Sequence, residues 1–431
     1  MSRTSPPAGR IPAAHVAAVS IGNALEFYDF LTFSLFAVYI GEAFFPGKDP
    51  TEKLLSALAT FWVGFLTRPV GAMVLGPLGD RIGRKPAMLI SFSMIGLAML
   101  GLALTPTYAQ IGVAAPILAV TFRLIQGFAL GGNVGPTTAY MLEAAPPQRR
   151  GFFAAFQYSS QGAAVLGSSV AGLLLASFLG PKDLAAWGWR IAFLVGVIIV
   201  PFGIWLRERL PETLEAAAGA AQAPDAPSGR PRSTPIRPYA RLIVCGFLLL
   251  VSGTIVTYAL LYLTTFALDT LKLGPGVAFG VSAVNAVTLI LFSLVGGRLS
   301  DRLGRRWVIL VSAVISAAVT WPIFWAIVHH PGWMSLFGGV AILGILTSIA
   351  AAPVIVALTE GLPPAIRSGG VAIVYAFAIS VFGGATQFVL KDVLVASGDP
   401  MTPAWFLICA LALAVPAAWF MRESAPAKVG A

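Results

Sequence analysis

The sequence predicts an all-α membrane protein with twelve transmembrane helices, arranged as two pseudo-symmetric bundles of six. Hydrophobic residues make up 57% of the chain and charged residues only 11%, whereas an average soluble domain has about 25% charged residues. Long apolar segments follow one another, each close to the roughly 20 residues that cross a bilayer as a helix. A charged loop also occurs twice, separated by about half of the 431-residue chain.

The repeated loop is the first sign that the two halves are related. The stretch GPLGDRIGRK at 76–85 returns as GRLSDRLGRR at 297–306. A second pair of similar stretches follows the fourth expected span of each half, EAAPPQRRG at 143–151 and EGLPPAIRSG at 360–369. Internal repeats of this kind are common in membrane carriers, whose substrate sites lie near the bilayer midplane between the repeats.

The apolar segments define the expected spans, and residues 208–239 interrupt them with a polar, Pro-rich stretch typical of a linker. The domains we expect are an N-terminal tail at 1–13, a first bundle at 14–207, a linker at 208–239, a second bundle at 240–422 and a tail at 423–431. The expected spans are 14–40, 54–79, 86–106, 111–142, 150–180, 187–207, 240–268, 276–299, 306–328, 333–360, 367–396 and 402–422.

The chain carries a net charge of +10, and the placement of its cations predicts its orientation. Most of the 28 Lys and Arg fall in the tails, the linker and the loops on one side, including both repeated loops. Cationic loops stay on the cytoplasmic side of a membrane. We therefore expect both termini to be cytoplasmic in a bacterial inner membrane, with lipid and no nucleic acid as a partner. Cys245 and Cys409 lie in apolar runs and are interpreted as packing residues.

Charged residues within the expected spans are few, and each is a functional hypothesis because a charge in the hydrocarbon core costs at least about 2.5 kcal/mol. Arg123 lies near the middle of the fourth span, and Gln126 shares its helix face. A guanidinium group can bind a carboxylate through two parallel hydrogen bonds, so Arg123 is a candidate anchor for an anionic substrate. The alternative is an ion pair with Glu26 or Asp29. Arg68 is either a second carboxylate contact or a brace between the first two spans.

Glu26 and Asp29 are the candidate proton-coupling sites. They lie one turn apart on the first span and are the only carboxylates deep within an apolar stretch. Burial disfavours a charged carboxyl group unless a cation pairs with it, so either could exchange a proton, and we place Asp29 ahead of Glu26. The alternative is a permanent ion pair with Arg68 or Arg123. We find no matching intramembrane charge in the second half, and we interpret Lys391 as a rim charge at the outer end of its span.

Other polar side chains within apolar runs are candidates to line a substrate cavity. The alternative for each is a hydrogen bond between helices, worth about 0.6 kcal/mol. His329 and His330 are expected to be solvated in an external loop, and no spacing indicates a metal site. The substrate candidates of this kind are Asn23, Tyr28, Gln157, Tyr158, Gln161, Tyr258, Tyr262, Asn285 and Tyr375.

The repeated loops are interpreted as gate elements rather than substrate contacts. The Asp of each loop can cap the following helix or pair with a loop arginine, and these contacts would break when the protein opens toward the cytoplasm. The alternative is that the arginines only keep these loops on the cytoplasmic side. The gate candidates are Asp80, Arg81, Arg84, Asp301, Arg302 and Arg305.

Several short motifs occur in order along the chain, namely GNALEFYDF at 22–30, FFP at 44–46, RPVG at 68–71, RLIQGF at 123–128, WGWRIAF at 187–193 and FGG at 382–384. Together with the repeated loop, they resemble the major facilitator superfamily, and within it the metabolite–proton symporter family with its citrate and tricarballylate carriers. The resemblance covers nearly the whole chain. It implies the twelve-helix fold and a carboxylate-binding Arg at position 123, where carboxylate carriers of the family keep one.

One residue departs from that family. Its members commonly carry Glu where this chain has Asn133, and an amide cannot take up and release a proton in the physiological range. Proton coupling here would then rest on the first span, or it would be altered or lost.

The sequence therefore predicts a secondary transporter that couples a di- or tricarboxylate to protons by alternating access, with sodium an open replacement for protons. We expect a monomer that is not an enzyme and carries no cofactor. No Gly-x-x-x-x-Gly-Lys-Ser/Thr loop is present, so ATP is not expected to drive it. The alternatives are transport of another organic acid or a zwitterion, a drug or metabolite antiporter, and a sensor built on the same fold.

Overall fold

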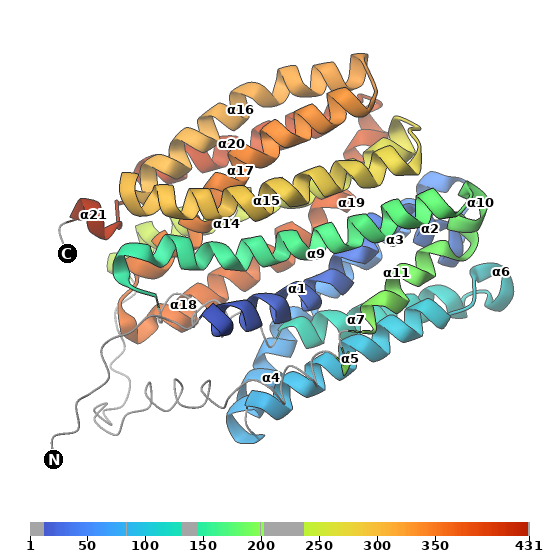
Figure 1. Cartoon of the computed structure of the whole chain (residues 1–431), viewed down its shortest axis with the longest axis horizontal. Helices are drawn as coiled ribbons and strands as arrows, with labels where there is room; N and C mark the ends of the chain where they lie inside the picture. Colours follow the sequence, from blue (N-terminus) through green and yellow to red (C-terminus); the bar gives the residue numbers. More distant parts are fainter. Residues whose placement is uncertain (1–12, 83, 132–144, 199, 202–236, 430–431) are drawn as a thin grey trace.

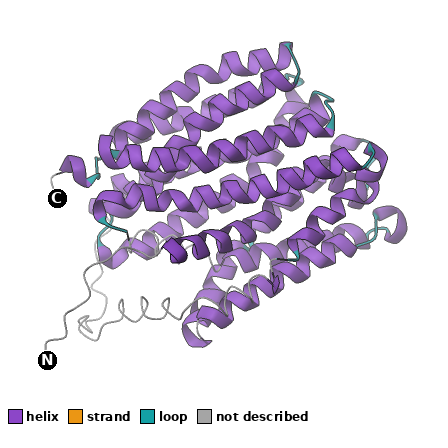
Figure 2. Cartoon of the chain, viewed as in Figure 1, coloured by secondary structure: helices purple, strands orange, loops and turns teal. Residues whose placement is uncertain are grey.

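The structure is a computed structural model that describes residues 13–82, 84–131, 145–198, 200–201 and 237–429. Within these ranges every regular element is a helix (Figure 2). Nine helices there are long and apolar enough to cross a membrane, and one bent pair forms a tenth. A shorter apolar helix covers Leu89–Leu104, and the expected span at 187–207 begins in the described residues. The all-α, twelve-helix fold predicted from the sequence is confirmed.

The first half runs from α1 to α11. Its elements are α1 (Ala13–Leu35), α2 (Ala37–Phe44), α3 (Pro50–Leu66), α4 (Arg68–Ile82), α5 (Arg84–Leu104), α6 (Tyr108–Ile111), α7 (Ala114–Gly131), η1 (Pro147–Arg149), α9 (Arg150–Phe178), α10 (Pro181–Asp183), η2 (Leu184–Gly188) and α11 (Trp189–Gly196).

The second half runs from η3 to α21. Its elements are η3 (Arg237–Tyr239), α14 (Ala240–Thr265), η4 (Phe266–Thr270), α15 (Pro275–Leu303), α16 (Arg305–His329), α17 (Trp333–Gly361), α18 (Pro364–Phe377), η5 (Ala378–Gly383), α19 (Gly384–Ser397), α20 (Thr402–Phe420) and α21 (Pro426–Val429).

Two of the expected spans of the first half are interrupted helices. The first bends by 66° between α1 and α2. The second is divided at Thr67 into α3 and α4, and Pro69 follows two residues later in the chain. Proline has no backbone N–H to continue the helix, and the Thr67 hydroxyl instead donates to the carbonyl oxygens of Gly64 and Leu124 at 3.1 and 3.0 Å. Arg68 therefore begins a helix directly after this break.

The two halves pack side by side along α9 and α15, which lie next to each other over their length (Figure 1). Glycine permits the closest approach. A Cβ on Gly151 would lie 2.5 Å from the Gly297 oxygen, and a Cβ on Gly172 would lie 2.4 Å from the Phe279 ring. On another face α3 packs against α19, where Gly384 lies against Trp62 and Phe65.

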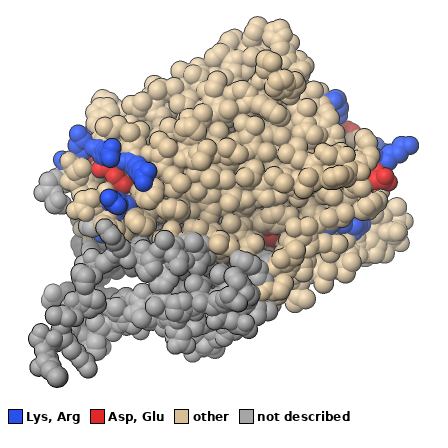
Figure 3. Space-filling view, in the orientation of Figure 1, with Lys and Arg blue, Asp and Glu red and all other residues tan. Residues whose placement is uncertain are grey.

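Charged side chains gather at the two ends of the molecule and leave an apolar band between them (Figure 3). This is the distribution that a bilayer requires, because charges are costly in its hydrocarbon core. The end at which α9 begins, α15 ends and α16 begins is here called the Arg-rich end. It carries Arg149, Arg150, Arg298, Arg302, Arg305, Arg306 and Arg422.

Candidate functional site

A cavity that is partly open to solvent lies against the helices of the second half. It brings together six of the predicted substrate residues. Its wall also carries small polar side chains that the sequence analysis did not select, because isolated Ser and Thr are ordinary in membrane helices. The predicted residues in the wall are Arg68, Tyr158, Gln161, Tyr258, Asn285 and Tyr375; the additional polar ones are Ser252, Thr254, Thr257, Ser312, Ser316, Thr347 and Ser348.

Arg68 is the one cationic side chain that lines this cavity in the part of the chain that the structure describes. It is only 8% exposed. Its guanidinium carbon lies 4.2 Å from the ring centres of both Phe30 and Phe65, and Tyr258 lies beside it. Its Nε and Nη2 atoms have no hydrogen-bond partner among the described residues. Buried donors are nearly always paired in native proteins, so two unpaired donors on an arginine that lines a cavity are unusual.

Arg123 is completely buried on α7 and does not line the cavity. Its Nη1 donates to Gln126 Oε1 at 2.7 Å, and Gln126 Nε2 donates to Asp29 Oδ1 at 2.8 Å. Its guanidinium carbon lies 4.3 Å from the centre of the Phe30 ring and 4.4 Å from that of Phe33. Cation–π contacts contribute about 2 kcal/mol when they are desolvated. We call the chain Arg123–Gln126–Asp29 the buried relay.

The buried relay differs from both sequence interpretations of Arg123. The guanidinium group does not face the cavity in this structure, and an amide links it to the carboxylate of Asp29. Asp29 is 2% exposed and Glu26, one turn earlier, is 5% exposed. Neither proton-coupling candidate lines the cavity, and Asp29 lies close to the cation Arg123.

The remaining substrate candidates of the first half connect helices. Asn23 Nδ2 donates to Ser160 Oγ at 2.7 Å, and Gln157 Nε2 donates to Asn23 Oδ1 at 3.1 Å, so these residues join α1 to α9. The Tyr28 hydroxyl donates to the Ala192 carbonyl oxygen at 3.0 Å and joins α1 to α11. These are the interhelical hydrogen bonds that the sequence analysis kept as the alternative. Tyr262 on α14 is also completely buried away from the cavity wall.

The expectation for Lys391 needs correction. It is 4% exposed rather than a solvated rim charge, and its Nζ forms an ion pair with Asp269 Oδ2 at 2.5 Å. Asp269 lies in the apolar span Ala240–Thr270, and Lys391 lies in Ile373–Ser397. The second half therefore does contain intramembrane charge. The two residues are far apart in the sequence, so only tertiary packing reveals that they neutralise each other.

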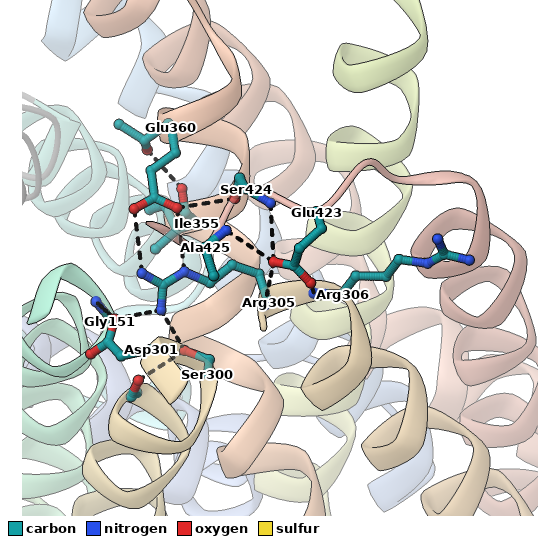
Figure 4. A network of polar contacts seen from close by, with 12 residues as sticks. Gly151, Ser300, Asp301, Arg305, Arg306, Ile355, Glu360, Glu423, Ser424 and Ala425 are labelled. Carbon is teal, nitrogen blue, oxygen red and sulfur yellow. Dashed lines mark hydrogen bonds and ion pairs between the residues drawn. The ribbon is translucent and has the colours of Figure 1, made fainter. Parts of the chain in front are cut away.

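A second polar network occupies the Arg-rich end (Figure 4). Arg305, completely buried, donates through Nη1 to Asp301 Oδ1 at 2.6 Å and to Ser300 Oγ at 2.8 Å. Its Nε and Nη2 donate to the two oxygens of Glu360 at 3.3 Å. We call Asp301, Arg305 and Glu360 the end network. Arg302, also predicted as a gate residue, is exposed.

Asp301 joins the two halves in a way that the sequence did not predict. Its Oδ1 accepts a hydrogen bond from the Gly151 N–H at 2.9 Å, and its Oδ2 accepts one from the Phe152 N–H at 3.0 Å. These N–H groups lie in the first turn of α9, which has no intrahelical acceptors for them. Asp301 thus pairs with the loop arginine Arg305, one of the two contacts considered from the sequence, and caps a helix of the other half instead of the helix that follows it.

The C-terminal segment completes this network. Glu423 Oε1 accepts a hydrogen bond from the Arg305 N–H at 2.7 Å, and Glu423 Oε2 accepts one from the Arg306 N–H at 3.2 Å. Ser424 Oγ donates to Glu360 Oε2 at 3.0 Å. Carboxylates stabilise helix N-termini, so Glu423 caps α16. The sequence analysis assigned residue 423 to a tail and missed this role, because a single Glu after the last span has no distinctive pattern.

Comparison with known proteins agrees with this architecture. The model of the Major Facilitator Superfamily matches residues 19–288 and 280–431. The chain belongs to the major facilitator superfamily. It is thus a multi-pass membrane transporter, and the family predicted from the motifs is confirmed.

Two curated relatives of this transporter are citrate–proton symporters. That of Klebsiella pneumoniae is 32% identical over 95% of this chain and 92% of its own length. That of Salmonella typhi is 34% identical over 94% of this chain and 93% of its own length. The α-ketoglutarate permease of Escherichia coli is 31% identical over 87% of this chain and 85% of its own.

A solved structure of the xylose transporter XylE from E. coli, in a partially occluded inward-open conformation, has the same fold. Its TM-score to this transporter is 0.77, at 17% identity over 96% of this chain and 98% of that one. This likeness shows the fold alone.

The other predicted residues of the transporter lie where the structure gives no side-chain geometry. Asn133 lies outside the described residues. The side chains of Asp80, Arg81 and Arg84 are likewise outside the description, although α4 and α5 include these positions. Their roles stay predictions.

Proposed function

We propose that this transporter takes up a small organic acid with two or three carboxylate groups and couples its entry to protons by alternating access. The observation that carries the proposal is Arg68, a cationic side chain that lines a cavity formed by both halves and has two donors unpaired among the described residues. Carboxylates are natural partners for such a group. The named substrates of the relatives, citrate and α-ketoglutarate, support the same class.

Arg68 takes the carboxylate-binding role in this proposal, and Arg123 stands behind it. Tyr258 and Tyr375 flank the Arg68 guanidinium group. Gln161, Tyr158 and Asn285 would bind the other oxygens of the acid, together with the Ser and Thr hydroxyls of the opposite wall. Hydroxyls and amides can donate or accept, so this wall suits carboxylate and hydroxyl groups alike.

Proton coupling is assigned to Asp29, with Glu26 as the second candidate. Moving one negative charge inward against a membrane potential costs about 2.3 kcal/mol per 100 mV, so an anion needs accompanying cations to accumulate. Asp29 is a buried carboxyl group one amide away from Arg123, and Asn133 cannot substitute for it. Sodium in place of protons is the competing arrangement.

The end network is proposed as the gate on the cytoplasmic side. Asp301 holds the first turn of α9, so the halves cannot separate there without breaking its hydrogen bonds. The topology proposed with it has both termini and the linker in the cytoplasm, bundles at 14–207 and 240–422, and a monomer in a bacterial inner membrane. No cofactor or catalysed covalent step is part of the proposal.

Uptake by the purified protein in liposomes tests the function. Labelled citrate, α-ketoglutarate and a monocarboxylate would each be offered under an imposed pH gradient and, separately, a sodium gradient. We expect the di- and tricarboxylates to accumulate when the outside is acidic. Accumulation driven by a sodium gradient alone would show that sodium, and not the proton, is the coupling ion. Absence of uptake for every acid would overturn the proposal.

A zwitterionic substrate is the second candidate. A proline/betaine transporter of Salmonella typhimurium is 29% identical over 95% of this chain and 83% of its own length. A single cationic side chain in the described cavity wall also fits a substrate with one carboxylate. Adding labelled proline and betaine to the liposome panel separates the two candidates.

A further inference from the structure

One aromatic ring lies against both buried guanidinium groups of the first half. The guanidinium carbons of Arg68 and Arg123 lie 4.2 and 4.3 Å from the centre of the Phe30 ring. Other rings contact only one of the two groups. Phe65 contacts Arg68, and Phe33 contacts Arg123. Phe30 is therefore the shared contact.

The two guanidinium groups belong to different environments. Arg68 lines the cavity, whereas Arg123 begins the buried relay that ends at Asp29. In both groups Nε and Nη2 have no hydrogen-bond partner among the described residues, so aromatic contacts contribute much of what holds each group in place. Phe30 is 1% exposed and directly follows Asp29 in α1. Its apolar ring therefore lies between Arg68 at the cavity and Arg123 of the buried relay.

We propose that Phe30 is a positioning residue that couples carboxylate binding at Arg68 to proton uptake at Asp29. This inference rests on the proposed function. A carboxylate bound to Arg68 neutralises one of the two positive charges beside the ring. The ring excludes water, and charges interact strongly across a dry, low-dielectric gap. The ionised form of Asp29 then loses part of its stabilisation, and Asp29 takes up a proton from the solution that supplied the substrate.

Several other groups on and around α1 take part in the same balance. α9 contributes the neutral Gln157 and Ser160, which bond to Asn23, six residues before Asp29 in α1. The charged group that acts directly on Asp29 is Arg123 on α7, and Arg68 on α4 and Tyr258 on α14 act in turn on Arg123. Tyr28 and Glu26 are the titratable neighbours of Asp29 on α1. Arg68 is the cation among them that the cavity exposes to substrate.

Calorimetric binding to the purified full-length protein tests the inference. Citrate, and separately α-ketoglutarate, is titrated in two buffers with different ionisation enthalpies, which reports the protons taken up per acid bound. We expect about one proton per acid for the wild-type protein, because binding and protonation are linked. Phe30→Leu should bind citrate several-fold more weakly and take up few or no protons. Phe30→Tyr, which keeps the aromatic face, should restore both.

Phe65→Leu is the matched control, because the Phe65 ring contacts the guanidinium group of Arg68 and not that of Arg123, while the Phe30 ring stays in place. It should weaken binding while leaving proton uptake intact. Full proton uptake by Phe30→Leu would overturn the inference, and so would equal loss of proton uptake in Phe65→Leu. If the wild-type protein binds neither acid, the proposed function is overturned, and this inference with it. That outcome differs from the two above, in which the wild-type protein does bind acid.

Discussion

Arg123 and Arg305 are both completely buried, one in each half, yet their surroundings are opposite. Arg305 donates to the carboxylates of Asp301 and Glu360 and to a Ser hydroxyl, and uses Nη1, Nε and Nη2. Arg123 donates to a single amide oxygen, and its Nε and Nη2 have no hydrogen-bond partner among the described residues. Aromatic rings cover its faces instead.

The difference teaches how two related halves divide their work. A buried cation with its donors satisfied by carboxylates is strongly held, because removal of one partner leaves an uncompensated charge. That suits a contact which fastens the halves together. A buried cation held by rings and one amide can respond to a new charge nearby at a smaller energetic cost. That suits the proposed substrate and proton sites, which must change state in every transport cycle.

The largest expected effect comes from breaking the satisfied arginine. Arg305→Leu leaves the carboxylates of Asp301 and Glu360 buried without their cation. The variant should lose about 3–5 kcal/mol of stability, measured as a lower unfolding temperature in detergent. Arg302→Ala is the control, because that neighbouring side chain is exposed. Equal unfolding temperatures for both variants would show that the end network does not fasten the halves.

Arg123→Lys should give the next largest effect. Lysine keeps the charge but loses the planar fork that spans the rings and Gln126. Loss of a charged hydrogen bond costs about 2–3 kcal/mol, so initial uptake should fall about 100-fold. Expression measured on blots should hold. Uptake near the wild-type rate would mean that the relay needs only the positive charge.

Arg68→Lys is the contrasting change at the cavity. It removes two-point carboxylate binding but leaves the relay intact, so we expect KM to rise about tenfold, equivalent to about 1.4 kcal/mol, with accumulation still driven by pH. The measurement is uptake rate against substrate concentration. A fall in kcat with unchanged KM would assign Arg68 to conformational change instead of binding.

Asp29→Asn should uncouple transport from protons. A pH difference of one unit sustains at most about tenfold accumulation for one coupled proton. The variant should lose this accumulation while still exchanging labelled for unlabelled substrate, and its uptake should no longer rise as the external pH falls. Glu26→Gln is the paired variant. If accumulation driven by a pH gradient survives in both variants, proton coupling depends on other residues.

The smallest expected effect concerns the C-terminal cap. Glu423→Ala removes the acceptor for the first N–H groups of α16. Loss of a helix cap costs about 1 kcal/mol, so the unfolding temperature should fall slightly. Glu423→Asp can still accept hydrogen bonds, so its unfolding temperature should lie between those of the wild type and Glu423→Ala. No change in either variant would mean that water replaces the cap without cost.

Local sequence was sufficient for the helices and for the choice of unusual residues. Glu26, Asp29, Arg68 and Arg123 stand out because charges are rare in apolar runs, and all of them are buried. Which of them lines the cavity was not predictable, because that depends on how helices distant in sequence pack around each side chain. Lys391 was misjudged for the same reason, since its partner Asp269 comes from another helix.

The sequence by itself determined the membrane class, the duplicated six-helix halves and the family, because hydrophobic length and repeated motifs are properties of the chain read in order. Only the tertiary structure decided which guanidinium group reaches the cavity, which carboxylate joins the halves and which ring lies between two cations. These facts depend on helices that are distant in sequence. Their side chains acquire partners only when packing orients them, and a buried charge is functional or structural according to those partners.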